Sequence, residues 1–161
     1  MYDFLKDPQF LENRKNKNHH FFGNVGLESP TWDDVLSLVS IDAKQNPKFK
    51  ISHDYMVAID SGQHLKYVGK FLKEYAKVDL SKQATSHIYI SLLNIGAYGR
   101  HKDRADVLFW QILGSTHWLV EDTQKSEYIL KPGDAIYIPI GMYHTVHSLS
   151  PRVGVSFGLD Y

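Results

Sequence analysis

Residues 96–118 of the chain read Gly-Ala-Tyr-Gly-Arg-His-Lys-Asp-Arg-Ala-Asp-Val-Leu-Phe-Trp-Gln-Ile-Leu-Gly-Ser-Thr-His-Trp. His101 and Asp103 lie two positions apart in this stretch, just before the apolar run Val107–Leu113, which predicts a buried strand. Because alternate residues of an extended chain project from the same face, the imidazole and the carboxylate are expected to point the same way. The pair therefore predicts half of a metal site, with the other half supplied from elsewhere in the chain.

A His-x-Asp pair is a short motif that also arises without any function. The alternative interpretation of His101 and Asp103 is a pair that only forms hydrogen bonds in a turn. The surrounding sequence decides between the two interpretations.

The composition fits one soluble domain over residues 1–161, a size that buries about 70% of its unfolded surface. Eighteen basic and eighteen acidic residues leave no net charge, so nothing in the composition indicates a nucleic acid or an anionic membrane as partner. The absence of cysteine excludes disulfides and thiolate sites. No segment has the length of a signal-peptide core or a membrane span, and we expect a cytoplasmic protein.

Residues 1–85 predict an N-terminal arm followed by helices and one strand. Residues 1–28 are polar and irregular, and Phe21 and Phe22 are expected to anchor them on the core. Thr31 and Asp34 have the spacing of a capping box, which predicts a helix start. The expected elements are helices over residues 31–45 and 63–77 and a strand over residues 55–59.

Residues 86–161 change to short segments rich in β-branched and aromatic residues, separated by Gly, Pro and Ser. Helices followed by about eight antiparallel strands predict an α+β fold, mainly β, whose β part closes into a barrel or sandwich. The expected strands cover residues 87–95, 107–113, 117–121, 128–130, 135–138, 145–149 and 153–157.

Residues 133–144 read Gly-Asp-Ala-Ile-Tyr-Ile-Pro-Ile-Gly-Met-Tyr-His. Gly133 suits a tight turn, while Pro139 and Gly141 predict a second turn that brings His144 to the start of the next strand. The spacing of these four residues fits the second cupin motif. Its place downstream of the His-x-Asp pair makes the two pieces together much more specific than either alone, and predicts His144 as the third ligand.

His147 is the competing third ligand. It lies three residues after His144, so on a strand the two side chains point to opposite faces and cannot bind one metal ion. The motif spacing favours His144, with His147 facing outward.

Both segments resemble the core of the JmjC and cupin-type oxygenases, especially the ribosomal-protein hydroxylases. The residues that carry the resemblance are His101, Asp103, Asp106, Val107, Gln111, Gly114 and Trp118, then residues 130–141 with His144, and the closing strand 153–158. The resemblance implies a double-stranded β-helix (cupin or jelly-roll) that holds Fe(II) through His101, Asp103 and His144. Two imidazoles and one carboxylate leave coordination positions free for 2-oxoglutarate and dioxygen. It thus implies a 2-oxoglutarate-dependent hydroxylase with a protein or small-molecule substrate.

The sequence departs from this family at Thr116, where the relatives usually place the Lys or Arg that binds the distal carboxylate of 2-oxoglutarate. A hydroxyl can form a hydrogen bond with a carboxylate but cannot neutralise it. Arg152 is the expected replacement, with Ser156 on the same side of the last strand; a rim position beside Pro151 is the alternative. Tyr98 matches a position that often donates a hydroxyl to 2-oxoglutarate.

The substitution at Thr116 leaves two other functions open. One is a metal-binding cupin of another class, such as an isomerase or a dioxygenase that needs no cosubstrate. The other is a non-enzymatic binding module with the cupin fold.

Overall fold

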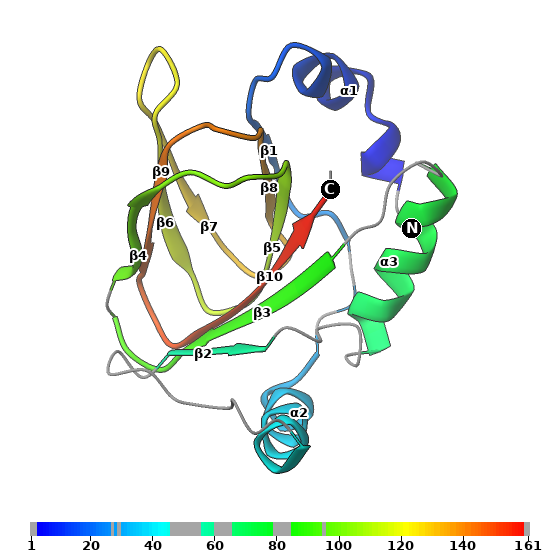
Figure 1. The fold of residues 1–161 in the computed structure, drawn as a ribbon, viewed down its shortest axis with the longest axis vertical. Helices are drawn as coiled ribbons and strands as arrows, with labels where there is room; N and C mark the ends of the chain where they lie inside the picture. The colour runs from blue at the N-terminus through cyan, green and yellow to red at the C-terminus, as the bar shows by residue number, and fades with distance from the viewer. Residues whose placement is uncertain are drawn as a thin grey trace.

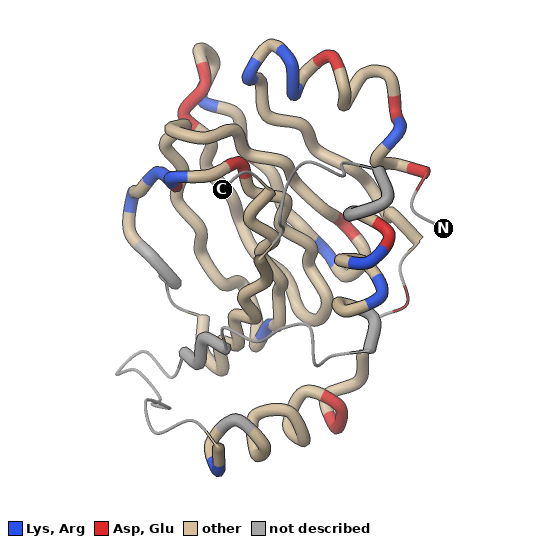
Figure 2. Tube along the Cα trace, turned by 45° about the vertical axis from the view of Figure 1, so that its right-hand side comes forward, with Lys and Arg blue, Asp and Glu red and all other residues tan. Residues whose placement is uncertain are grey.

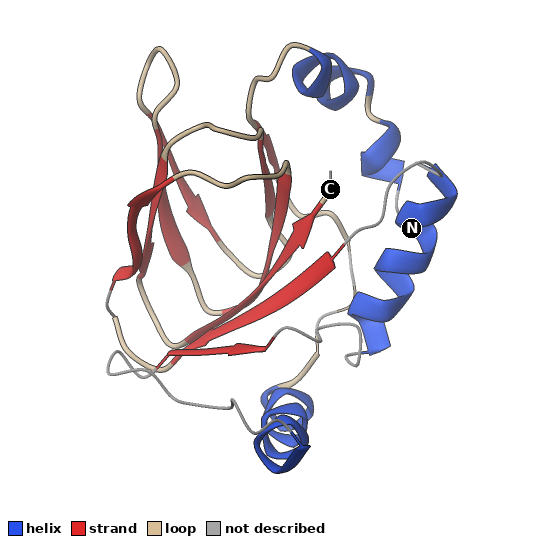
Figure 3. Cartoon of the chain, viewed as in Figure 1, coloured by secondary structure: helices blue, strands red, loops and turns tan. Residues whose placement is uncertain are grey.

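Two antiparallel sheets face each other across an apolar interior in the computed structural model of the chain (Figure 1). The expected α+β, mainly β fold is confirmed, as a double-stranded β-helix with helices packed on its outside (Figure 3). The structure describes residues 3–26, 28, 30–45, 56–59, 66–78, 85–94 and 96–159, without the side chains of residues 42, 56–59, 66–67, 76–78 and 96–98.

The larger sheet has the strand order β1-β8-β5-β10-β3-β2, and the smaller sheet has the order β4-β9-β6-β7. The strands of the larger sheet are β1 (His20–Phe22), β2 (Met56–Ile59), β3 (Thr85–Ser91), β5 (Val107–Leu113), β8 (Ala135–Ile138) and β10 (Arg152–Gly158). Those of the smaller sheet are β4 (Gly96–His101), β6 (Thr116–Val120), β7 (Ser126–Leu130) and β9 (His144–Ser148). The helices are the 3-10 helix η1 (Asp3–Lys6), α1 (Pro8–Lys15), α2 (Trp32–Gln45) and α3 (Lys66–Val78).

The run Val107–Leu113 is apolar because both of its faces are covered. Leu108, Trp110 and Ile112 belong to the core cluster that includes residues of all four helices. Val107 and Phe109 belong to the second cluster, which fills the space between the two sheets. A strand packed on both faces needs apolar side chains at nearly every position, and the sequence shows that run.

The helices cover the outer face of the larger sheet, as Figure 3 shows. The predicted capping box is present at the start of α2: the backbone N–H of Asp34 donates to the Thr31 hydroxyl, and the N–H of Thr31 donates to the Asp34 carboxylate. Among the described residues, no helix is both long and apolar enough to cross a membrane.

The prediction of an irregular arm over residues 1–28 was wrong, since this segment forms η1, α1 and β1. Only Phe10 of α1 is buried, so the helix carries almost no apolar periodicity for a sequence pattern to detect. The missed signal was its N-terminus: Asp7 accepts a hydrogen bond from the backbone N–H of Phe10 as N-cap, and Pro8 follows it. The anchoring role expected of Phe22 is confirmed by its place in the core.

The strand expected over residues 87–95 is also corrected. β3 ends at Ser91, the exposed Leu92 and Leu93 follow in a bend, and a separate strand, β4, starts at Gly96. The chain changes sheets here, from the inner part of the larger sheet to the edge of the smaller one. The sequence does not reveal this crossing, because the apolar residues Leu92 and Leu93 suggest that the buried strand continues.

Three loops meet at one end of the barrel, the upper end in Figure 1. His101 and Val120 are both register partners of His144, which places the end of β4, the end of β6 and the start of β9 side by side. The loops of residues 102–106, 121–125 and 139–143 therefore surround the same opening, and charged residues gather on these loops and on the helices (Figure 2).

Candidate metal centre

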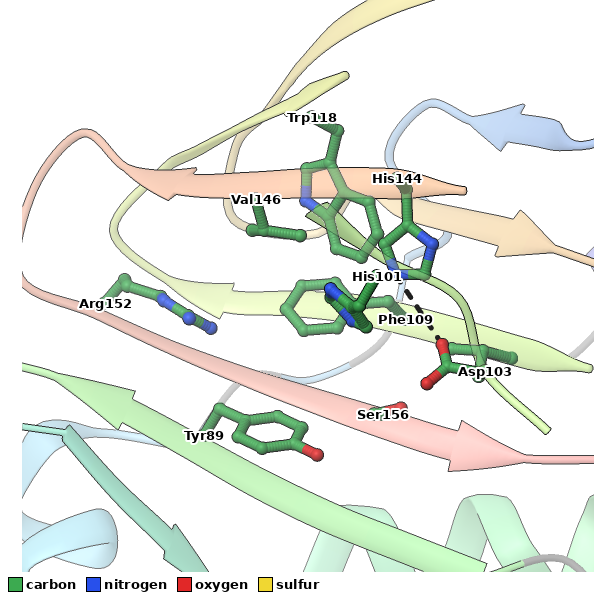
Figure 4. A pocket seen from close by; sticks show the side chains of 10 residues that line it. Tyr89, His101, Asp103, Phe109, Trp118, His144, Val146, Arg152 and Ser156 are labelled. Atoms are coloured by element: carbon green, nitrogen blue, oxygen red, sulfur yellow. Dashed lines mark ion pairs between the residues drawn. The ribbon is translucent and has the colours of Figure 1, made fainter. Parts of the chain in front are cut away.

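The three predicted ligands come together at this end of the barrel (Figure 4). Each of His101, Asp103 and His144 offers a ligand atom, and these atoms all lie within 4.8 Å of one another. Nε2 of His144 lies 3.6 Å from Oδ2 of Asp103, and the two imidazole centroids are 4.3 Å apart. Within the described part of the chain, no other group of three such side chains is arranged in this way.

Backbone carbonyls fix the tautomer of both histidines. Nδ1 of His101 lies 2.8 Å from the carbonyl oxygen of Gly99, and Nδ1 of His144 lies 3.1 Å from that of Met142. A carbonyl only accepts hydrogen bonds, so each Nδ1 carries the proton and Nε2 keeps the lone pair. This arrangement orients imidazole ligands in metal sites and sets which nitrogen faces the metal.

His144 is almost completely buried, whereas the Asp103 side chain is 36% exposed. Burial lowers the pKa of His144, and the neighbouring His101 lowers it further, against the opposing effects of the Met142 carbonyl and the Asp103 carboxylate. The neutral imidazole is the form that binds a metal ion, so the surroundings favour the binding-competent state.

Aromatic rings hold the His144 imidazole in place. The indole of Trp118 stacks on it with centroids 5.5 Å apart and planes 17° apart, and Phe109 packs against Trp118 at 4.9 Å. A ring confined between packed neighbours loses little freedom when it binds a metal, which is the preorganisation that such a site needs.

A cavity of about 250 Å³ joins the three ligands to the opposite wall of the barrel (Figure 4). Tyr89 from β3 and Arg152 and Ser156 from β10 line that wall. The smaller sheet thus supplies the imidazoles, and the larger sheet supplies a cation and hydroxyl groups across the same space.

Solved structures of one protein share this architecture. The structure of YcfD, a ribosomal oxygenase from Escherichia coli, matches with a TM-score of 0.76 at 20% identity, over 96% of this chain and 51% of that one. YcfD in complex with cobalt and 2-oxoglutarate gives 0.75 at 18% identity over the same shares. YcfD with cobalt and succinic acid gives 0.73 at 20% identity, again over 96% and 51%. No family model and no curated protein sequence matches the chain.

The chain shares the fold of these solved structures. The predicted resemblance to JmjC and cupin-type oxygenases is confirmed at the level of the fold. The chain spans about half the length of the YcfD chains that it matches. Within this shared fold, the chain's own residues decide what the site can bind.

The donor set of this chain suits a divalent transition metal on chemical grounds. Imidazole nitrogen and carboxylate oxygen are ligands for such ions, and a set of two histidines and one carboxylate is typical of non-haem Fe(II) sites with open positions. His101, Asp103 and His144 supply that set, and the cavity lies directly beside them.

Arg152 lies inside the barrel and not at its rim. It is only 2% exposed, its Nε donates a hydrogen bond to the Ser148 hydroxyl at 3.1 Å, and its guanidinium points into the cavity (Figure 4). A buried cation lowers its free energy when it meets an anion, and a guanidinium pairs well with a carboxylate. Ser156 lines the same cavity four residues later on β10.

Thr116 takes part in a different set of contacts. The Trp118 Nε1–H donates to the Thr116 hydroxyl at 3.0 Å, and that hydroxyl donates to Oε1 of Gln111 at 2.7 Å. The amide nitrogen of Gln111 donates to the carbonyls of Leu113 and Val153, which fixes which end of the amide faces Thr116. The only hydroxyl proton of Thr116 is therefore committed to Gln111, and Thr116 does not line the cavity.

The other residues considered for the site lie on β4, on β9 and in the loop that follows β4. Tyr98 lies on β4, where its Cα is the register partner of Val146, but its side chain is outside the described part of the structure. His147 is exposed on the outer face of β9, as predicted. Lys102 and Arg104, which alternate with the ligands in the sequence, are exposed.

Tyr89 is a cavity residue that the sequence did not reveal. On β3, Ser86, Ile88 and Ile90 are buried, with the two isoleucines in the core under the helices. The alternation of a strand then turns Tyr89 toward the barrel interior. The sequence does show a strict alternation of aliphatic residues with His87 and Tyr89. It does not show which of the two sets faces the barrel interior and which faces the helices.

Proposed function

We propose that the chain is a 2-oxoglutarate- and Fe(II)-dependent oxygenase that hydroxylates a C–H bond of a protein or small-molecule substrate. One observation supports this most strongly: the His101, Asp103 and His144 cluster shares a cavity with the buried guanidinium of Arg152. A ligand with a chelating end and a distal carboxylate, such as 2-oxoglutarate, suits both walls.

Each residue has a distinct part in the proposed reaction. His101, Asp103 and His144 would hold ferrous iron through two nitrogens and one oxygen. When bound there, ferrous iron would supply the chemistry that couples oxidation of 2-oxoglutarate to succinate and carbon dioxide with oxidation of the substrate C–H bond to C–OH, one oxygen atom of dioxygen going to succinate and the other to the product. Arg152 binds the distal carboxylate, assisted by Ser156, and the apolar rings of Phe109 and Trp118 keep water away from the reacting atoms.

The size of the cavity bears on the substrate. At about 250 Å³ it is below the range of about 300–1,000 Å³ that encloses a whole drug-sized ligand. A cavity of this size suits a cosubstrate and a single group of a substrate, such as a side chain, better than a whole larger molecule. The lack of cysteine suits the reducing cytoplasm, which we propose as the location.

Calorimetry with the cobalt(II)-loaded protein tests the proposal, since cobalt holds 2-oxoglutarate without consuming it. We expect Arg152→Met to weaken 2-oxoglutarate binding about tenfold or more, because hydrogen bonds to charged groups contribute about 1.5–3 kcal/mol. Arg104→Met is the matched control at an exposed arginine and should bind 2-oxoglutarate like the wild type. With ferrous iron and dioxygen, the wild type should release succinate.

Two results would contradict the proposal. The first is a metal-loaded wild type that does not bind 2-oxoglutarate. The second is an Arg152→Met variant that binds it as tightly as the wild type does.

A metal-binding cupin without a cosubstrate is the second candidate. The observation that favours it is Thr116, whose hydroxyl donates to Gln111 and so offers no proton to a carboxylate. Metal binding without any 2-oxoglutarate affinity would select this candidate over the oxygenase.

A further inference from the structure

A buried carboxylate joins the two segments that carry the metal ligands. Asp106 is 8% exposed and lies three residues after Asp103. Its Oδ1 accepts a hydrogen bond at 2.8 Å from the backbone N–H of Ile140, which lies four residues before His144. This single side chain therefore connects the loop of residues 102–106 to the loop of residues 139–143.

A second hydrogen bond runs between the same two loops. The backbone N–H of Gly141 donates to the carbonyl oxygen of Asp103 at 3.2 Å. Gly141 has a φ of +81°, a conformation that glycine adopts without strain, and its N–H points at the other loop. Two consecutive N–H groups thus point at the segment that contains the carboxylate ligand.

The other oxygen of Asp106 is held from the side of the core. The hydroxyl of the fully buried Tyr137 donates to Oδ2 at 2.8 Å, and Nε of Arg14 lies 3.8 Å from the same oxygen. Arg14 also donates to the Tyr75 hydroxyl of α3 at 3.4 Å. A carboxylate held at both oxygens cannot rotate, so the position of Asp106 is tied to β8 and to the N-terminal helix.

We propose that Asp106 is a positioning residue for the metal centre: it holds the Asp103 and His144 segments in the register that lets both ligands reach one ion. The inference rests on the metal centre of the proposed function. Asp106 is not one of the three residues whose ligand atoms cluster, so it would act only through the backbone of the two loops.

Cobalt(II) binding to the purified chain tests this role, followed by calorimetry and by the visible d–d absorption bands. We expect Asp106→Ala to lower cobalt affinity about tenfold, within the range of about 10–100-fold for residues that support metal ligands. The d–d bands should also change in position or intensity, because the ligand geometry changes.

Asp106→Asn is the conservative variant. Its amide oxygen can still accept the Ile140 N–H, and its amide nitrogen can donate to Tyr137. We expect it to recover most of the cobalt affinity lost in Asp106→Ala. A purely structural role would instead lower stability without changing the d–d bands.

Asp134→Ala is the matched control. Asp134 also accepts a backbone hydrogen bond, from the N–H of Lys131 at 2.9 Å, but it lies at the opposite end of β8 from the ligands. The Asp134→Ala variant should be less stable than the wild type, but its cobalt affinity and its d–d bands should be unchanged.

Each result decides the inference. A folded Asp106→Ala variant with wild-type affinity and bands overturns it. If Asp106→Ala does not fold, Tyr137→Phe replaces it, because that change removes one of the bonds to Asp106; weaker cobalt binding supports the inference, and unchanged binding overturns it. A wild type that binds no cobalt overturns the metal centre itself, which separates that failure from the failure of this inference.

Discussion

The larger sheet is covered on both faces, whereas the smaller sheet meets solvent on its outer face. Every described residue of β8 is buried, and in β5 only the last residue is partly exposed. Strands β6 and β9 alternate between buried and accessible positions, and every residue of β7 except Leu130 is partly or fully exposed. The cause is the set of helices, which pack on the larger sheet alone.

The two sheets also contribute different halves of the candidate site. The imidazoles of His101 and His144 come from the smaller sheet, and Arg152, Ser156 and Tyr89 come from the larger one. In the proposed function, metal binding and cosubstrate binding therefore depend on different strands. Mutations can therefore separate the two properties.

The largest effect is expected at the inner face of the smaller sheet. His144→Ala removes a metal ligand and should lower metal affinity by more than about 100-fold, the upper figure for residues that only support ligands. His147→Ala, on the outer face of the same strand, should bind metal like the wild type. Cobalt titration of both variants checks this, and equal losses would show that the two faces of β9 are assigned wrongly.

The outer faces of the two sheets offer a matched pair of isoleucines. Ile112 on β5 is fully buried under the helices, and Ile129 on β7 is 56% exposed. Ile112→Ala should lower the free energy of unfolding by about 2–5 kcal/mol, through lost burial and the cavity left behind. Ile129→Ala should change it by less than about 0.5 kcal/mol. Urea denaturation measures both, and similar values would refute the one-sided burial of the smaller sheet.

Thr116→Val addresses the polar contacts inside the barrel. The change leaves the Trp118 N–H without its acceptor and Gln111 without its donor, which should cost about 1–3 kcal/mol of stability. We expect 2-oxoglutarate affinity to stay the same, because the proposed function assigns its carboxylate to Arg152 on the other sheet. A large loss of 2-oxoglutarate affinity in a stable Thr116→Val variant would indicate that Thr116, and not Arg152 alone, binds the carboxylate.

The smallest effect concerns the seam between the N-terminal arm and the smaller sheet. His19 lies 2.7 Å from the Tyr128 hydroxyl of β7, and burial lowers its pKa from the ordinary value of 6.5, partly offset by Asp122. The unfolded chain then binds the proton more tightly, so stability falls as the pH drops below about 6.5.

His19→Gln should flatten this slope between about pH 5 and 7, where an ordinary histidine titrates. Urea denaturation at several pH values measures the effect, and an unchanged slope would exclude His19. Burial also lowers the pKa of His20, so His20 adds a pH dependence of stability with the same sign in the wild type and in His19→Gln.

The β-rich half could be predicted because its strands carry strong local signals. The apolar run of β5 and the Gly-Pro-Gly-His spacing around β8 and β9 predicted their strands and the meeting of His144 with His101 and Asp103. Those signals arise from burial and from turn geometry, which a sequence expresses directly.

Two features could not be predicted, the N-terminal helix α1 and the hydrogen bonds of the Thr116 hydroxyl, and each has a physical reason. α1 buries one residue and is stabilised by its N-cap and by contacts to distant segments, so periodicity is absent. The engagement of the Thr116 hydroxyl depends on Gln111 and Trp118, which meet it only in the folded barrel. Sequence spacing indicates which strand a residue occupies, but it does not show which partner takes its proton.

His101 lies at the end of β4, an edge strand of the smaller sheet whose register with β9 is interrupted twice. His144 lies on β9, which has neighbours on both sides. Edge strands open more readily than strands with two neighbours. The ion is therefore expected to leave through local fraying of β4 while the barrel stays folded. Its exchange rate should follow the amide hydrogen exchange of that single strand and not the rate of global unfolding.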